Sequence, residues 1–149
     1  NLYLIPYAHY ESFVSGKIHH KYDLVFFKHY LLNLAEKIAI EKGYDAIATG
    51  DNLGQVASQT IENMRASGHG ISLPIFRPLL TYDKDEIVKI AKEIGTYELS
   101  IQEYKDCCSI IAMRPDTSVN ISKVKDTLSK VDINKLIQKS LSEMGIFEV

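Results

Sequence analysis

Residues 49–60 read Thr-Gly-Asp-Asn-Leu-Gly-Gln-Val-Ala-Ser-Gln-Thr, and this stretch is the most informative of the chain. It follows the candidate buried strand Asp45–Ala48, as a strand-to-helix turn would. Gly50 lets the backbone approach a ligand closely, and Gly54 lets a helix begin tightly. Free N–H groups at a helix start favour an anion or the polar edge of a base. An ordinary turn would show the same spacing, because the stretch is neither a Walker A loop nor a GxGxxG fingerprint.

The segments on either side of this turn alternate between strand and helix. The pattern predicts strands over residues 2–6, 45–48 and 71–76, an irregular or weakly helical segment over 7–21, and helices over 22–42, 56–64 and 83–95. Residues 96–115 are expected to be loop, and two short helices follow, the second starting at Asp132. This order predicts an α/β fold with a parallel sheet and a C-terminal helical tail. Ligands of such sheets bind beyond the carboxyl ends of the strands.

Composition excludes several classes of protein. A chain of 149 residues with 46% hydrophobic and 24% charged residues makes about one folded domain and is not disordered. The 17 basic and 19 acidic residues exclude a basic surface over the whole chain, though not a local patch. No apolar run approaches the roughly 18 residues typical of a membrane span. The only cysteines, Cys107 and Cys108, are adjacent and do not form a secreted disulfide framework, which favours a cytoplasmic protein without a metal site.

Three ordered segments of the chain match one known family. Residues 49–60 resemble the TG-(D/E)-x-LGQVASQT signature of the tRNA 4-thiouridine synthetases, the ThiI family. Residues 73–87 resemble that family's LPV-x-RPL…DK-x-EI segment, and residues 94–108 resemble its IGTYE…DCC stretch. The resemblance implies a PP-loop ATP pyrophosphatase domain with a Rossmann-like sheet of the HUP (adenine nucleotide alpha hydrolase-like) type. Residues 1–115 would be the latter part of that domain, and residues 116–149 its helical extension.

The resemblance also implies a reaction. Family members use ATP with Mg²⁺ to adenylate a tRNA uridine, and sulfur from a persulfide then displaces AMP to leave 4-thiouridine. Many also supply sulfur for the thiazole of thiamine. The implied partners are tRNA and a cysteine desulfurase or another persulfide or sulfide donor, and a homodimer is expected. A related PP-loop enzyme with another acceptor, and a non-catalytic nucleotide- or RNA-binding module, stay open as alternatives.

Several residues fall on family positions at the nucleotide. Gly50 and Gln59 match positions that contact the adenine nucleotide. Lys28 stands where the family usually has Arg, so the charge is kept but the bidentate fork is lost. The neighbouring His29 replaces a second usual Arg. Asp51 would help to place magnesium or a ribose hydroxyl, with helix capping as the alternative.

The remaining candidates lie downstream. Arg77 and Lys84 suit a phosphate of ATP or tRNA as positioning charges, with plain surface charge as the alternative. Cys108 matches the family cysteine proposed to receive or resolve persulfide sulfur, a step that needs a thiolate. Cys107 is the second candidate, and both would otherwise be small buried fillers.

One family element is missing from the chain. The pyrophosphate loop, an SGG-x-DS motif, has no counterpart, and Val14–Lys17 is the nearest string. We therefore expect the pyrophosphate-loop and THUMP segments to lie upstream, in the same or a separate chain. Without them the strands would expose edges and apolar faces, so activity of these 149 residues alone is in doubt.

Overall fold

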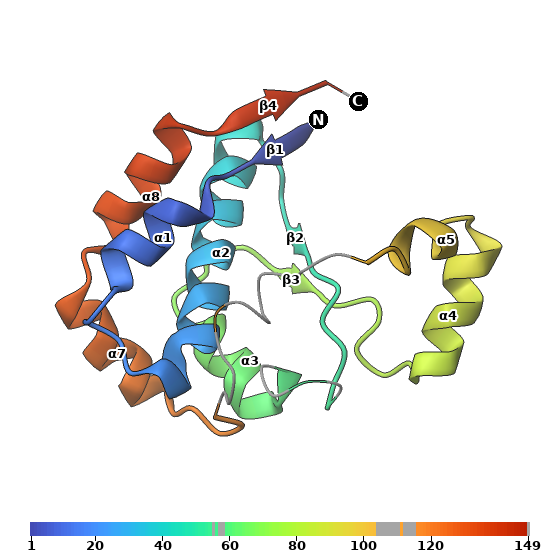
Figure 1. The fold of residues 1–149 in the computed structure, drawn as a ribbon, viewed down its shortest axis with the longest axis horizontal. Coiled ribbons are helices and arrows are strands. Elements are labelled where there is room, and N and C mark those ends of the chain that lie inside the picture. Colours follow the sequence, from blue (N-terminus) through green and yellow to red (C-terminus); the bar gives the residue numbers. More distant parts are fainter. Residues whose placement is uncertain (55, 57–58, 104–110, 112–115, 149) are drawn as a thin grey trace.

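The computed structural model describes residues 1–54, 56, 59–103, 111 and 116–148 (Figure 1). Helices dominate, and the strands are two or three residues long. In chain order the elements are β1 (Leu2–Leu4), α1 (Tyr7–Val14), α2 (His20–Lys42), β2 (Ile47–Ala48), α3 (Ile61–Ser67), β3 (Ile75–Phe76), α4 (Lys84–Glu93), α5 (Tyr97–Ser100), α7 (Ile121–Lys130), α8 (Ile133–Ser142) and β4 (Gly145–Phe147).

Helix α2 is the central element of the fold. At its start, Nδ1 of His19 accepts a hydrogen bond from the backbone amide of Lys21 at 3.3 Å. At its end, Gly43 adopts φ 72°, a left-handed conformation that glycine accepts without a Cβ penalty. Helices α3, α7 and α8 pack against α2, which explains why buried side chains occur around most of its circumference. The helix predicted over residues 22–42 is confirmed, with two further residues at its start.

The larger core lies where α1, α2 and α8 meet. Tyr10 of α1 is fully buried, and its ring centroid lies 4.8 Å from that of Phe27 and 5.2 Å from that of Tyr30. Leu136 of α8 is also fully buried in this cluster. Burial of these rings stabilises α1, which is why the segment after Pro6 is a regular helix rather than an irregular one. A second core joins α2, α3 and α7 through Val25, Ala66, Val119 and Val124.

Two separate strand pairs replace the single parallel sheet that the sequence predicts. Strands β2 and β3 are parallel, with Ile47 opposite Ile75, so the parallel part of the prediction is confirmed. Strand β1 instead pairs antiparallel with β4, with Leu2 opposite Phe147, and Figure 1 shows both chain ends side by side there. The short pattern over residues 2–6 carried no information about a partner so far along the chain. Strand β3 is also shorter than the predicted strand over residues 71–76.

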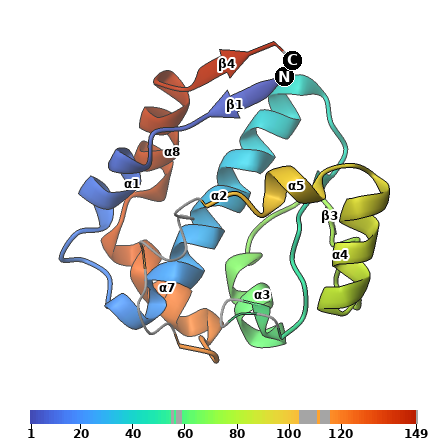
Figure 2. The same cartoon turned by 45° about the vertical axis from the view of Figure 1, so that its right-hand side comes forward.

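Helix boundaries agree with the sequence where local capping sets them. Helix α4 begins at a complete capping box between Asp83 and Glu86, and α8 begins after the cap Asp132, both as predicted. Helix α3 begins at Ile61 rather than at residue 56, and α5 forms inside the predicted loop over 96–115. In Figures 1 and 2, α4 and α5 lie on the β3 side, away from α1 and α8. Within the described residues, no helix is both long and apolar enough to cross a membrane.

Candidate nucleotide-binding site

The turn after β2 is tied to the loop after β3 by hydrogen bonds. The amide of Thr49 donates to the carbonyl of Phe76 at 2.9 Å, which prolongs the strand pairing beyond Ala48. The side chain of Asn52 is buried, and its Nδ2 donates to the carbonyls of Leu79 at 2.7 Å and Tyr82 at 2.5 Å. Both loops leave the carboxyl ends of the parallel strands and are held as one unit.

Three of the predicted site residues meet at this unit. Lys28 reaches from α2, and its Nζ lies 2.6 Å from Oδ1 of Asp51. Arg77, directly after β3, places Nε 3.3 Å from Oδ2 of the same carboxylate, and Thr49 Oγ1 donates to that oxygen at 2.9 Å. The side chains of Lys28, Asp51 and Arg77 are 20%, 13% and 19% exposed. These three residues and Thr49 are called the Asp51 cluster below.

The environment of Asp51 fixes its charge. Burial by itself would raise the pKa of this carboxyl, but the hydrogen bond and charge of Lys28, followed by Thr49 and Arg77, lower the pKa below its ordinary value. Asp51 is therefore ionised at neutral pH. Two cations around one anion leave the cluster with one net positive charge, which favours an anionic ligand at the carboxyl end of the strand pair.

The turn around Gly50 is open on the side where a Cβ would lie. A Cβ placed on Gly50 would meet no atom within 4 Å, so the described residues leave room for another molecule to approach the backbone. Further along, the amide of Gly54 donates to the carbonyl of Gln59 at 3.0 Å, with Gly54 at φ 79°. The helix that follows begins only at Ile61, so the helix predicted over residues 56–64 is wrong at its start. The side-chain oxygen of Thr60 caps α3 instead.

Other predicted residues do not join the cluster. Lys84 is the first residue of α4, is exposed, and forms no ion pair with the described part of the chain. Gln59 is half-buried, and its backbone forms its hydrogen bonds to the described residues Gly54 and Val56. Cys107 and Cys108 lie outside the described residues.

His29 has a structural environment rather than that of a phosphate ligand. It is 3% exposed, and its Nδ1 lies 2.9 Å from the carbonyl of Ser67 on α3. Burial lowers the pKa of His29; the hydrogen bond to Ser67 opposes this effect, and the charge of His69 adds to it. The ring is neutral at physiological pH and connects α2 to α3.

Sequence reasoning missed three polar residues that hold this region together. Thr49 and Asn52 lie inside the signature stretch, so their place in that motif was the available signal. Asn63 of α3 had no such signal. It is fully buried, and its Nδ2 donates to the carbonyl of Asp116 at 2.8 Å while its Oδ1 accepts from the amide of Val119 at 2.7 Å. These bonds attach α3 to the segment that leads into α7.

The described residues do not fit a magnesium site of their own. Both oxygens of Asp51 are taken by Lys28, Thr49 and Arg77, whereas Mg²⁺ requires free oxygen ligands in a near-octahedral arrangement. Among the described residues, no group of three or more His, Cys, Asp or Glu side chains could hold a metal ion.

Comparison with known proteins gives the family of this chain. The family model described as thiamine biosynthesis protein (ThiI) matches residues 1–133. The chain therefore belongs to the ThiI family.

Individual relatives are consistent with this membership. The chain is 40% identical over 141 residues to a protein of Staphylococcus saprophyticus described as a probable tRNA sulfurtransferase, covering 94% of the chain and 35% of the relative. It is 38% identical over 149 residues to a protein of the same description from Staphylococcus aureus strain MRSA252, covering 99% of the chain and 37% of the relative. The chain thus spans little more than a third of these proteins.

A solved structure shares the fold. It is a crystal structure of a 4-thiouridine synthetase–RNA complex with bound ATP, and it matches with a TM-score of 0.87 and 35% sequence identity. The match covers 99% of this chain and 39% of the solved chain.

Proposed function

We propose that this chain is the nucleotide-binding and sulfur-transfer portion of an ATP-dependent tRNA sulfurtransferase that makes 4-thiouridine. The observation that carries the proposal is the Asp51 cluster, in which residues from α2, from the turn after β2 and from the loop after β3 converge at one site. In a chain of the ThiI family, a net positive cluster at the carboxyl ends of parallel strands suits a nucleoside triphosphate. The 4-thiouridine synthetase that shares the fold contains bound ATP.

In this proposal Lys28 and Arg77 bind phosphate oxygens of ATP, while Gly50 lets the backbone approach the nucleotide. The role of these side chains is to position the phosphates and neutralise charge as pyrophosphate leaves. Gln59 is proposed to contact the nucleotide and Lys84 to contact a phosphate of ATP or tRNA. Mg²⁺ would be held by the ATP phosphates and by groups other than Asp51.

The chemistry proposed for the complete enzyme is leaving-group activation. The uridine carbonyl oxygen attacks the α-phosphate of ATP, and pyrophosphate leaves. The terminal sulfur of a persulfide then attacks the activated ring carbon, and AMP departs with the former carbonyl oxygen, which leaves the uridine joined to the persulfide cysteine through an S–S bond. A second thiolate attacks the cysteine sulfur of that bond, so that 4-thiouridine is released and the two cysteines form a disulfide, which an external thiol reduces before the next turnover. Cys108 is proposed to receive or resolve the persulfide, which requires its thiolate form. Cys107 is the alternative.

Family membership also suggests partners for this chain. We propose tRNA as the substrate and a cysteine desulfurase, or another persulfide or sulfide donor, as the source of sulfur. We further propose a homodimer located in the cytoplasm and a second role in supplying sulfur for the thiazole of thiamine. We also propose that upstream pyrophosphate-loop and THUMP segments complete a Rossmann-like sheet with residues 1–115. The contacts of α7 with α2 and α3 support treating residues 116–149 as an extension of that domain.

The test is thiolation of a tRNA transcript by the complete protein with ATP, Mg²⁺ and a persulfide donor. The product is digested, and 4-thiouridine is measured by its absorbance and mass. We expect ATP-dependent formation of 4-thiouridine that a non-hydrolysable α,β-methylene analogue of ATP does not support. Thiolation that proceeds equally well without ATP would contradict the proposal.

A further inference from the structure

The segment that enters β3 is held by a single carboxylate of α2. Oε1 of Glu36 accepts hydrogen bonds from the backbone amide of Ser72 at 2.6 Å, from Oγ of Ser72 at 2.7 Å and from the amide of Leu73 at 3.0 Å. Hydrogen bonds to an ionised acceptor are shorter and stronger than those between neutral groups. One side chain of α2 therefore fixes two consecutive residues at the entry to the strand.

The environment of Glu36 keeps this carboxylate charged. Burial by itself would raise the pKa of Glu36, but the hydrogen bonds from Ser72 and Leu73 and the charge of Lys37 lower the pKa below its ordinary value. Glu36 is therefore ionised at neutral pH and accepts all three bonds as an anion. The side chain is only half-buried, so water screens the contact, and its main effect is on geometry rather than on stability.

Strand pairing passes this fixed position on to Arg77. The amide of Ile47 donates to the carbonyl of Pro74 at 2.9 Å, and the amide of Thr49 donates to the carbonyl of Phe76 at 2.9 Å. These two bonds hold β3 in register with β2, and Arg77 is the residue that follows. A displacement at the entry to β3 would therefore move the start of the loop that carries the guanidinium.

Helix α2 is tied to this strand at two points with matching spacing. Glu36 lies about 12 Å beyond Lys28 along the helix axis. Arg77 lies about 13 Å beyond Leu73 along an extended chain. Glu36 binds Leu73 at one end of the strand. At the other end, Lys28 and Arg77 share the carboxylate of Asp51. Helix and strand thus run in opposite directions and are held together at both ends.

We propose that Glu36 is a positioning residue of the Asp51 cluster. By holding the entry of β3 against α2, it sets where the guanidinium of Arg77 lies relative to Lys28, so that one phosphate can contact both cations. The inference rests on the proposed function for the identity of the ligand, which is ATP. The placement of Arg77 against Asp51 can be measured without any ligand.

ATP affinity of the complete protein tests this role. Glu36→Ala removes the acceptor and should weaken ATP binding about tenfold, because a displaced cation contacts the phosphate less well. Glu36→Gln should retain binding, because the amide oxygen of its side chain still accepts hydrogen bonds from backbone N–H groups. Isothermal titration calorimetry distinguishes the two variants. A loss of affinity in Glu36→Gln as large as that in Glu36→Ala would overturn the proposal.

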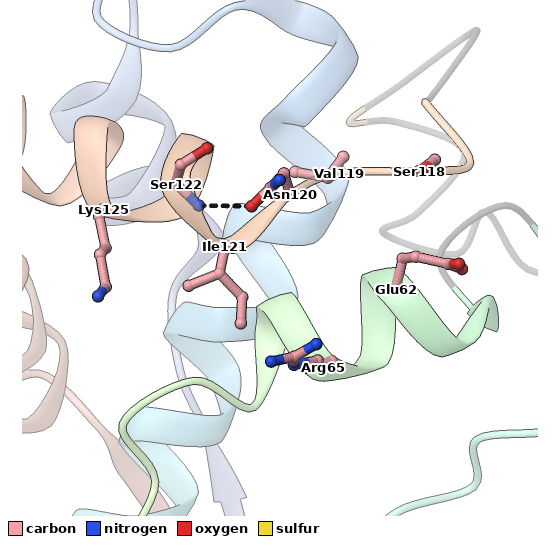
Figure 3. A pocket seen from close by; sticks show the side chains of 8 residues that line it. All are labelled: Glu62, Arg65, Ser118, Val119, Asn120, Ile121, Ser122 and Lys125. Atoms are coloured by element: carbon pink, nitrogen blue, oxygen red, sulfur yellow. Dashed lines mark hydrogen bonds between the residues drawn. The ribbon is translucent and has the colours of Figure 1, made fainter.

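Two controls with the same change of charge separate position from charge. Glu41→Ala removes an exposed carboxylate from the same helix, and Glu62→Ala removes one from α3. Figure 3 shows Glu62 in the lining of a pocket of about 420 Å³, which residues of α3 and of the segment 118–125 form. Both controls should bind ATP as the wild type does. A tenfold loss in either of them would overturn a specific role for Glu36.

A double-mutant cycle tests whether Glu36 acts through Arg77. In the Arg77→Ala background, Glu36→Ala should cause no further loss of ATP affinity, because the side chain that it positions is absent. A merely structural role would give the same loss with and without Arg77. Such additive losses would overturn the proposal.

Titration of Asp51 separates this inference from the proposed function. The charge of Arg77 helps to lower the pKa of Asp51, so Glu36→Ala should raise that pKa in the ligand-free protein, whereas Glu36→Gln should not. NMR of isotope-labelled aspartate measures the pKa, and the signal is identified by its loss in Asp51→Asn. An unchanged pKa in Glu36→Ala would overturn the positioning role alone. A raised pKa, together with unaltered ATP affinity in Arg77→Ala, would support the positioning role and contradict the proposed function.

Discussion

Nζ of Lys28 lies 2.6 Å from Oδ1 of Asp51, so a side chain from the middle of α2 is held against the turn that follows β2. The same carboxylate also binds Arg77 after β3. This single acid therefore fixes the relative position of two cations that belong to distant parts of the sequence.

Replacing Asp51 by Asn should reduce stability, because Lys28 and Arg77 would then face each other without an anion between them. The side chains are partly solvated, which screens this repulsion, so we expect a loss of about 1–2 kcal/mol in the free energy of unfolding. Urea denaturation of the wild type and the variant measures this loss. The variant Asp126→Asn, which breaks the exposed pair with Lys130, is the control and should leave stability essentially unchanged, because solvent screens that pair. Equal losses in the two variants would contradict a special role for Asp51.

Lys28 should contribute its charge to nucleotide binding. We expect Lys28→Met to weaken ATP binding by the complete protein about tenfold or more, because a phosphate would lose a charge-assisted hydrogen bond. Lys28→Arg should retain binding, since the guanidinium keeps the charge and adds donors. Isothermal titration calorimetry with ATP distinguishes the two variants. If Lys28→Met binds ATP as the wild type does, Lys28 is only a structural partner of Asp51.

His29 should make stability depend on pH near neutrality. Its folded pKa is lowered, chiefly by burial, so folding favours the neutral ring. This contribution is complete above the ordinary pKa of about 6.5 and is lost as the pH falls through the lowered folded pKa. The free energy of unfolding should therefore fall as the pH is lowered below about 6.5, with a smaller decrease in His29→Gln. Parallel pH curves for the two proteins would show that other groups cause the decrease.

Asn52 should be important for the geometry of the site although, among the described residues, its side chain bonds two backbone carbonyls and not the charged groups. Asn52→Ala leaves the carbonyls of Leu79 and Tyr82 without their donor and should cost about 1–3 kcal/mol. It should also reduce thiolation, since the loop that carries Arg77 would be less well held. Asn33→Ala is a control within α2, because the Asn33 amide bonds the carbonyl and lies 3.3 Å from ring Nε2 of His29 in the same helix. A larger loss of activity in the Asn33 variant would refute this role of Asn52.

Cys108→Ser in the complete enzyme should abolish 4-thiouridine formation and leave ATP binding unchanged, because a hydroxyl cannot carry persulfide sulfur. Cys107→Ser, one position earlier, should retain activity. Mass spectrometry of the digested tRNA measures the product. The reverse pattern would assign the role to Cys107, and full activity in both variants would exclude a cysteine of this pair.

Local signals predicted the local structure well. The capping box of Asp83 and Glu86 and the left-handed end of α2 at Gly43 depend on neighbouring residues, so the sequence alone is sufficient to locate them. The signature stretch and the segment over residues 73–87 also drew attention to Asp51 and Arg77, which the structure brings together. Their role at a nucleotide stays a prediction. The signature stretch did not predict that Asp51 would bind Lys28, since that contact depends on how α2 packs against the strands.

Longer-range features could not be predicted for the same physical reason. The pairing of β1 with β4 joins opposite ends of the chain, and strands this short show too little alternation to identify a partner. Helix α1 is stabilised mainly by the burial of Tyr10 against α2, which its own weakly amphipathic sequence does not indicate. The sequence does not distinguish Asn63 from an exposed polar residue, because its burial depends on its two hydrogen bonds to the segment before α7.

The Asp51 cluster implies an exchange of partners when an anion binds. In the free protein the carboxylate serves as an internal counter-ion that keeps two cations in place while offsetting one of their charges. An incoming phosphate would compete with Asp51 for those cations, so part of its binding free energy would be spent on releasing a bond already made. If the proposed function holds, nucleotide affinity at this site would be set by the difference between two similar ion pairs, which would favour rapid release of the product over tight binding of the substrate.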